Sequence, residues 1–289
     1  MGTVQSDNQQ NGWDCKSLIL FPCFQDFISD PTSKSEQSPG KEKSNGSRRR
    51  SSLVADLSDV DFDHPFLQAI ASKNLEEAKR SLMINPKVAR TARDSKGNTA
   101  AHIAAFWGLR KELEFLVLHE PDILWSQNEV KNSPVHKAAE AGRIEILDYI
   151  RDKDPTLLAS KGAMGATPMH LAASHGSLQA VIFLALNNSS LLTMRDRRGF
   201  SVVHYAAMHG QVPILAWIAE KRISLLSERS NQGDSPAHLA AMNNMVDALR
   251  LIAEKDINTL LHAEDNHGRS QHRVGSCLRD SWMIDAASN

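Results

Sequence analysis

The chain has 289 residues, of which 41% are hydrophobic, so it is long enough to bury at least one core. Its 33 Lys and Arg residues balance 34 Asp and Glu residues, which excludes a global electrostatic field directed at nucleic acid or at an acidic substrate. The three cysteines, Cys15, Cys23 and Cys277, are too few and too widely spaced for a disulfide framework, which favours a reducing, intracellular setting.

Residues 1–60 are predicted to form a disordered tail. The segment from Pro31 to Arg50 contains no aliphatic or aromatic side chain, so it cannot bury enough surface to offset the entropy of ordering. The most apolar stretch, Ser17–Ile28, is interrupted by Pro22 and is much shorter than the roughly 20 residues that cross a bilayer. It also lacks the features of a secretory signal, so we expect a protein that is neither secreted nor membrane-spanning.

The tail carries candidate modification sites. The opening Met1-Gly2-Thr3-Val4-Gln5-Ser6 fits the pattern for N-myristoylation, which makes Gly2 a candidate lipidation site. One acyl chain needs a second membrane signal, and residues 31–55 offer one with six Lys or Arg side chains against two Glu. The run of three arginines before Ser51 and Ser52 resembles substrates of basophilic kinases, and phosphate on these serines would loosen membrane contact. An unmodified, solvated tail and a basic nuclear-localisation patch are the alternatives.

A four-residue motif that begins with Ser or Thr and ends with His recurs along the rest of the chain. One residue after each histidine comes an Ala-Ala pair, and in four copies a glycine and an aliphatic stretch such as Ile144–Ile150 follow. A fixed period between 20 and 50 residues marks a repeat architecture. The histidines are 34 residues apart every time: His102, His136, His170, His204 and His238.

Each landmark has a physical role in a predicted pair of helices. A Ser or Thr before proline, as in Ser133-Pro134, is an N-cap followed by proline at the first helical position. Paired alanines let neighbouring repeats pack closely, and the glycine ends the first helix in a left-handed conformation. Aliphatic residues at helical spacing, such as Ile146 and Leu147, predict a second helix that buries one face. The fifth repeat has Asn244 in place of the glycine, so we expect a distorted reversal there.

This pattern resembles the ankyrin repeat, whose mark is T-P-L-H-x-A at a period near 33 residues. The resemblance covers about Asp94 to Ala263 and extends more loosely back to Pro65. It implies an all-α ankyrin-repeat solenoid, in which stacked helix-turn-helix units share one core. We therefore predict an N-terminal cap and about five repeats in residues 61–264, and a truncated, frayed repeat in residues 265–289. The segment Phe66–Leu82 has helix-pair spacing without the histidine motif, as expected for the cap.

The periodic histidines also suggest a metal or proton-relay site. Consecutive first helices pack about 8–10 Å apart, whereas two ligands of one zinc ion each lie about 2 Å from it, so neighbouring histidines cannot share an ion. The resemblance implies instead that each histidine bonds to the Ser or Thr hydroxyl and to the turn backbone. The sequence contains no phosphate-binding loop, Cys-x-x-Cys pair, zinc-protease motif or nucleophile elbow. We predict no catalytic residue, no metal, no cofactor, and a protein that is not an enzyme.

The resemblance further implies that partners bind to the turn tips and to the outward positions of the first helices, which line a concave face. The apolar members of this set are the strongest candidates, because the motif does not demand apolar side chains there and aromatic and Met residues are enriched at interfaces. The alternative is that Phe106 and Trp107 pack on the cap. The candidate partner-binding residues are Phe106, Trp107, Glu140, His175, Arg197, Arg198, Met208, His209 and Met242.

These observations predict an intracellular interaction scaffold, adaptor or regulatory subunit that binds a protein partner on the concave face. The alternative is a membrane-tethered scaffold or signalling regulator, positioned by Gly2 and switched by phosphorylation near Ser52. The expected partners are proteins, with a membrane surface as a further partner of the tail, and neither nucleic acid nor a small-molecule substrate. The expected location is cytoplasmic, with membrane-associated and nuclear locations as the alternatives that the tail leaves open.

Overall fold

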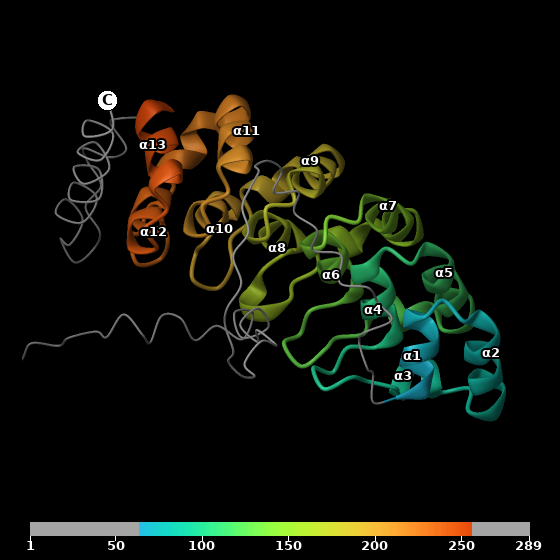
Figure 1. Cartoon of the computed structure of the whole chain (residues 1–289). Coiled ribbons are helices and arrows are strands. Elements are labelled where there is room, and N and C mark those ends of the chain that lie inside the picture. Colours follow the sequence, from blue (N-terminus) through green and yellow to red (C-terminus); the bar gives the residue numbers. More distant parts are fainter. Residues whose placement is uncertain (1–63, 256–289) are drawn as a thin grey trace, which may run out of the picture. The chain divides into compact units, whose positions relative to one another are not determined.

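The computed structural model describes residues 64–255, in which short helices follow one another in pairs (Figure 1). The first helix of each repeat begins directly after the Ser or Thr of the motif, which occupies the N-cap as predicted. In three of these helices proline stands in the first turn, where its fixed φ suits the helix and no hydrogen bond is lost. These first helices are α4 Ala100–Trp107, α6 Pro134–Glu140, α8 Pro168–Ser174, α10 Val202–Met208 and α12 Pro236–Met242.

A residue in the left-handed conformation reverses the chain after each first helix. Asn244 holds this place in the fifth repeat with φ +56°, and the amide of the next residue, Met245, donates to Ala240 O at 2.8 Å. The equivalent bond from Gln211 to Ala206 in the preceding repeat has the same length. The expected distortion at Asn244 therefore does not occur, because Asn tolerates the left-handed region better than most side chains. The other repeats use Gly108, Gly142, Gly176 and Gly210, with φ from +66° to +76°.

The second helices supply most of the large apolar side chains. In α5, for example, Leu113 and Leu116 are fully buried, and α7 contributes Ile146, Leu147 and Ile150 in the same way. Short 3-10 helices then lead the chain to the next turn. The second helices are α2 Leu75–Ile84, α5 Arg110–His119, α7 Ile144–Lys153, α9 Leu178–Asn187, α11 Val212–Arg222 and α13 Val246–Lys255; the 3-10 helices after α5, α7, α9 and α11 are η4 Pro121–Trp125, η5 Pro155–Ala159, η7 Ser189–Leu192 and η8 Ile223–Ser227.

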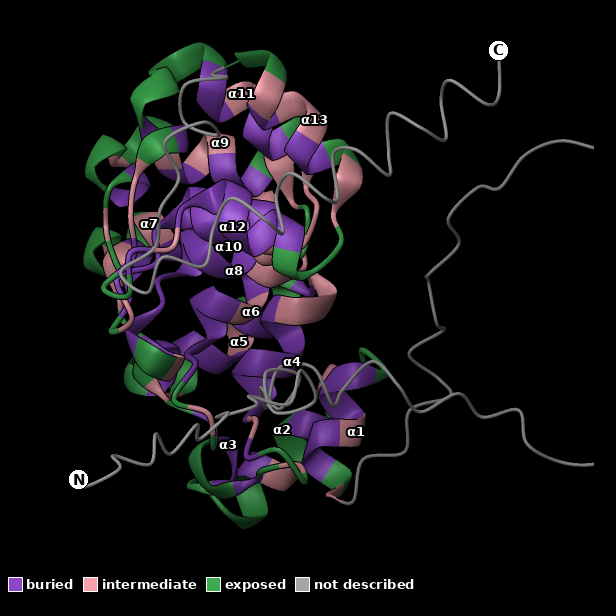
Figure 2. Cartoon of the chain, turned by 90° about the vertical axis from the view of Figure 1, so that its left-hand side faces the viewer, coloured by how far each residue is buried: buried purple, intermediate pink, exposed green. Residues whose placement is uncertain are grey.

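The first helices pack side by side in chain order, α4 on α6, α6 on α8, α8 on α10 and α10 on α12. Their paired alanines, such as Ala138 and Ala139, are fully buried, so no larger side chain separates the helices. Figure 2 shows these helices buried along most of their length. Helix α1, Pro65–Ala71, packs on α4 without the histidine motif and so stands in the position of the predicted cap, followed by α2 and α3, Val88–Thr91.

The predicted all-α stack of helix pairs is thus confirmed. Within residues 64–255 there is no strand, and none of the helices there is long and apolar enough to span a lipid bilayer. The predicted tail, residues 1–60, and the predicted truncated repeat, residues 265–289, lie outside the described part of the chain.

Lys131 is the basis of a first stability prediction. It has φ +63° at a turn position where the other repeats have glycine, and a left-handed residue other than glycine costs roughly 1–2 kcal/mol. Lys131→Gly removes this cost but adds about 0.5–1 kcal/mol of backbone entropy to the unfolded chain. We expect a net gain of about 0.5 kcal/mol, measured by urea unfolding.

Gly199→Ala is the matched control. At this equivalent position, a Cβ would lie 2.6 Å from the amide nitrogen of Asn231, so the variant should lose stability. A loss of stability in Lys131→Gly would show that the left-handed conformation costs Lys131 less than the backbone entropy that glycine adds to the unfolded chain.

Candidate functional site

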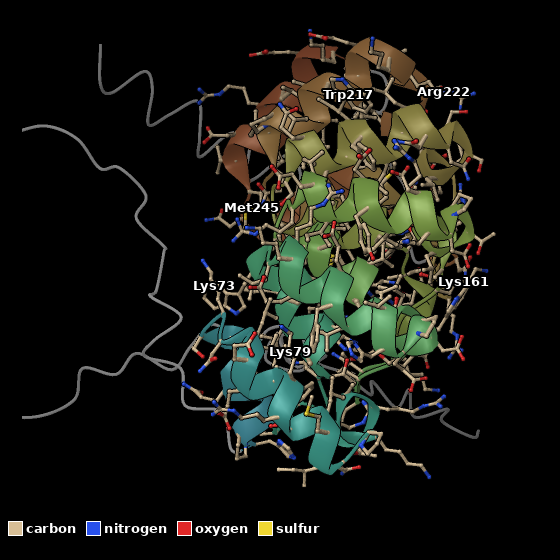
Figure 3. All side chains as sticks on the ribbon, turned by 90° about the vertical axis from the view of Figure 1, so that its right-hand side faces the viewer. Lys73, Lys79, Lys161, Trp217, Arg222 and Met245 are labelled. Atoms are coloured by element: carbon tan, nitrogen blue, oxygen red, sulfur yellow. The ribbon has the colours of Figure 1, made fainter. Side chains whose placement is uncertain are left out.

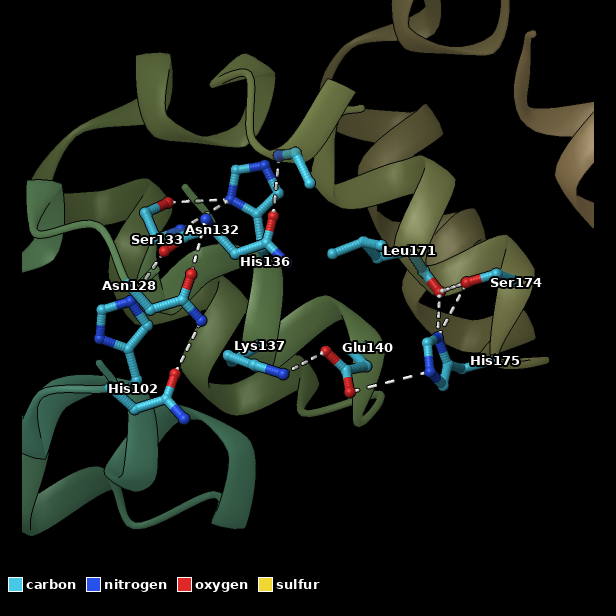
Figure 4. Close-up of polar contacts among 12 residues, drawn as sticks. His102, Asn128, Asn132, Ser133, His136, Lys137, Glu140, Leu171, Ser174 and His175 are labelled. Carbon is cyan, nitrogen blue, oxygen red and sulfur yellow. Dashed lines mark hydrogen bonds and ion pairs between the residues drawn. The ribbon is translucent and has the colours of Figure 1, made fainter. Parts of the chain in front are cut away.

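The motif histidines connect each turn to the next repeat. His102 Nδ1 lies 3.1 Å from the Thr99 amide and 2.9 Å from its hydroxyl, and Nε2 lies 2.9 Å from Asn132 O in the following turn. Because a carbonyl oxygen accepts only, Nε2 carries the proton and Nδ1 is the acceptor. His136, His170 and His204 repeat this arrangement, with Nε2 3.1–3.2 Å from Ala166 O, Phe200 O and Asp234 O. Figure 4 shows His136 bonded to Ser133.

Burial keeps these imidazoles neutral. It lowers the pKa of His102, His136 and His204 to about 4, well below the ordinary value of 6.5, and it lowers the pKa of His170 in the same direction. Both ring nitrogens of these four residues are used in hydrogen bonds within the stack, which is the structural role that the family resemblance implied. Within residues 64–255, no group of three or more His, Cys, Asp or Glu side chains is placed to hold a metal ion.

The turns before the first helices form one edge of the stack, which we call the turn edge: residues 92–99, 126–133, 160–167, 194–201 and 228–235. Backbone hydrogen bonds join adjacent turns, from the Arg197 amide to Met164 O at 2.9 Å and from the Asn231 amide to Arg198 O at 3.0 Å. Met164 belongs to a single 3-10 turn, η6 Ala163–Gly165. Figure 3 shows Lys161, on this edge, on the opposite side of the stack from the helix reversals marked by Lys73 and Met245.

The C-terminal ends of the first helices form a second row, which we call the helix-end row: Phe106 and Trp107 and their equivalents at 34-residue intervals. Phe106 and Trp107 are half-buried and their rings meet edge to face, with centroids 5.5 Å apart. Trp107 also packs against the hydrophobic core, which favours the structural alternative for this residue. Its role in partner binding stays a prediction.

A charged cluster lies in the middle of the helix-end row (Figure 4). Lys137 Nζ is 2.9 Å from Glu140 Oε2, and both side chains are only about 15% exposed. The Nε2 atom of His175 is 3.7 Å from the other Glu140 oxygen, so the structure brings together two residues that the sequence singled out separately. Lys137 was missed. Its signal was a lysine at a position that other repeats fill with Ile103, Leu171, Tyr205 and Leu239.

Beyond this cluster the predicted residues divide into an apolar and a cationic group. Met208 is half-buried and Met242 is 44% exposed, both at ends of first helices. Burial lowers the pKa of His209, next to Met208, to about 4, so this imidazole is neutral near pH 7. Arg197 is exposed on the turn edge. Arg198 lies over the Phe200 ring, with its guanidinium carbon 4.4 Å from the ring centroid.

A tyrosine and an aspartate support this turn. The Tyr205 hydroxyl donates to Asp196 Oδ2 at 3.0 Å, and Asp196 also accepts from the amides of Arg198 and Phe200 at 2.8 Å. Sequence reasoning did not select Tyr205, although it is the only polar aromatic residue among the equivalents of Lys137. The buried Asp196 carboxylate is thus fully occupied in shaping the turn that presents Arg197.

A family model for ankyrin repeats in three copies matches residues 118–194, 152–229 and 186–263. These overlapping matches span half of the chain, and their starts at residues 118, 152 and 186 are 34 residues apart, as the motif histidines are.

The chain belongs to the ankyrin repeat family.

Ankyrin repeats are generally modules for protein–protein interaction and are typically not catalytic. No curated protein matches the chain. The candidate sites Gly2, Ser51 and Ser52 lie outside the described residues, so they remain predictions from the sequence.

The buried histidines predict an acid-sensitive ankyrin stack. The unfolded chain takes up protons on His102, His136 and His204 below pH 6.5, whereas in the folded chain these residues take them up only near pH 4. Their contribution to stability is therefore complete above pH 6.5 and is lost as the pH falls towards 4. We expect the free energy of unfolding to fall by on the order of 1 kcal/mol per pH unit for each histidine, measured by urea unfolding between pH 6.5 and 5.

His136→Gln is the matched variant for this prediction. It should be less stable than wild type at pH 7 but should show a shallower dependence on pH, because one titrating group is gone. An unfolding free energy that is constant from pH 6.5 to 5 would contradict the neutral, buried state of these histidines.

Proposed function

We propose that the protein is an intracellular adaptor or regulatory subunit that docks a segment of a partner protein across the turn edge and the helix-end row. The observation that supports this most strongly is the contrast within the first helices α10 and α12. In α10 and α12, Ala206 and Ala240 are fully buried, whereas Met208 and Met242, two residues further on at the helix ends, are partly open to solvent. Large apolar side chains kept at such positions are characteristic of binding surfaces.

Methionine also suits the proposed role chemically. Its unbranched, polarizable side chain adapts to partner side chains of different shape. Beside Met208, the neutral His209 adds an imidazole ring, which has apolar carbon atoms and nitrogen atoms that form hydrogen bonds. The ankyrin stack thus offers adaptable contacts on a backbone that is held rigid by the histidine bonds.

A pair of double variants tests the location of the binding face. Met208→Glu/Met242→Glu adds two charges to the helix-end row and should reduce the recovery of bound proteins by at least tenfold in quantitative affinity purification. Leu118→Glu/Leu186→Glu adds the same charges to α5 and α9, where the leucines are 80% and 81% exposed, and should leave recovery unchanged. Equal recovery by both variants would place the partner elsewhere.

A membrane-tethered scaffold is the second proposal, and it rests on the sequence of the tail alone. The Met1–Ser6 pattern and the basic residues 31–55 together provide the two signals that stable anchoring requires. Cell fractionation should move Gly2→Ala from the membrane fraction to the soluble fraction, while Gln5→Ala, outside the fixed positions of the pattern, should behave as wild type. An intact mass without the acyl increment would remove this proposal and leave the adaptor proposal untouched.

A further inference from the structure

The turn edge is not uniform in charge along the stack. The turns 160–167, 194–201 and 228–235 contain five Lys or Arg residues and three Asp or Glu residues. Two of these acids are engaged within the stack: Asp196 is buried under its turn, and Glu228 lies 3.8 Å from Arg195. The side chains of Lys161 and Arg197 are exposed and, within the described residues, make no hydrogen bond or ion pair. These three turns therefore present unneutralised positive charge.

One exposed apolar side chain lies on the same turn as a cation, and two more lie at the far ends of the first helices. Met164, on the same turn as Lys161, is 47% exposed, and Met208 and Met242 lie at the ends of the first helices that follow the other two turns. On the N-terminal part of the face, the turns 92–99 and 126–133 hold three Lys or Arg residues against two Asp or Glu residues, and Lys137 with Glu140 forms a neutral pair. The C-terminal three repeats thus combine a cationic rim with the methionines Met208 and Met242 of the helix-end row.

We propose that the partner segment is extended and acidic, with Asp or Glu alternating with apolar residues, and that it binds along the turn edge of the repeats built on α8, α10 and α12. This inference rests on the proposed function. In an extended segment successive side chains point to opposite sides, so a segment that lies across the first helices points carboxylates toward Lys161 and Arg197 and apolar residues toward Met208 and Met242. Charge complementarity of this kind sets the choice of partner and the rate of association.

The chain itself contains a segment of this chemistry, Asp59-Val-Asp-Phe-Asp63, directly before the described residues. It cannot occupy the site in its own molecule. Five extended residues span at most about 17 Å, whereas three packing steps of about 8–10 Å each separate α1 from α8, the nearest first helix of the site. A segment of this chemistry must come from another molecule, and we assign it to a partner protein.

Fluorescence anisotropy with the full chain tests the proposal directly. The probe is a labelled synthetic peptide of residues 56–63, and its control is the same peptide with every Asp changed to Asn. We expect the acidic peptide to bind at least tenfold more tightly than the amide control, and its affinity to fall as salt is added.

Two double variants locate the binding. Lys161→Glu/Arg197→Glu should weaken the peptide at least tenfold, while Lys111→Glu/Lys221→Glu, which makes the same change in charge at exposed positions of α5 and α11, should change the affinity less than twofold. Equal weakening by both would show a non-specific charge effect, and no binding to wild type would overturn the proposal. Unchanged far-ultraviolet circular dichroism confirms that both variants fold.

Two further measurements separate this inference from the proposed function. Random-peptide display on the full chain should enrich alternating acidic and apolar sequences. Enrichment of neutral or basic peptides that Met208→Glu/Met242→Glu no longer binds would overturn the inference and leave the proposed function standing. Sedimentation velocity at several concentrations tests whether a second copy of this chain occupies the site. Self-association of the wild type that is lost when every Asp in residues 56–63 is changed to Asn would identify a second copy as the occupant and overturn the assignment to a partner protein.

Discussion

A buried imidazole at the start of each first helix is the interaction on which the rest of this structure depends. One nitrogen of His136 accepts from the Ser133 amide and so fixes where the helix begins, and the other donates to the carbonyl of Ala166 in the next turn. A single side chain therefore sets both the local structure of one repeat and the register of its neighbour. A charged imidazole carries a proton on both nitrogens and could not accept a bond from the Ser133 amide. This arrangement of the stack therefore requires a neutral imidazole.

The alanine pairs and the left-handed residues allow neighbouring repeats to keep this register. Small side chains at Ala138 and Ala139 bring adjacent helices close enough for the histidine to reach the next turn. The reversal at Gly142 or Asn244 then returns the second helix to cover the pair. Each repeat buries its apolar residues mainly against its neighbours, so the stability of the stack belongs to the interfaces between repeats rather than to any repeat alone.

The repeating backbone leaves only a few positions free to vary, and these positions carry the chemistry. The turn edge and the helix-end row are displayed at regular intervals on a rigid frame, while the residues placed there differ from repeat to repeat. Lys137 and Glu140 neutralise each other in the middle of the row, whereas Arg197 and Met242 further along remain open to a partner. One fold thus holds two chemically different stretches along the same face.

The sequence by itself determined the repeat, the helix pairs and the role of the histidines, because these follow from local rules: an N-cap before proline, small residues at close contacts, and a period of 34 residues. It was wrong about the reversal at Asn244, where the local cost of a missing glycine was overestimated. Only the tertiary structure decided how the variable positions combine. The ion pair of Lys137 with Glu140 is local, because the two residues are three apart on α6. The contact of His175 with that pair and the packing of Trp107 against the core join residues from different elements, and no local pattern in the sequence fixes such distances.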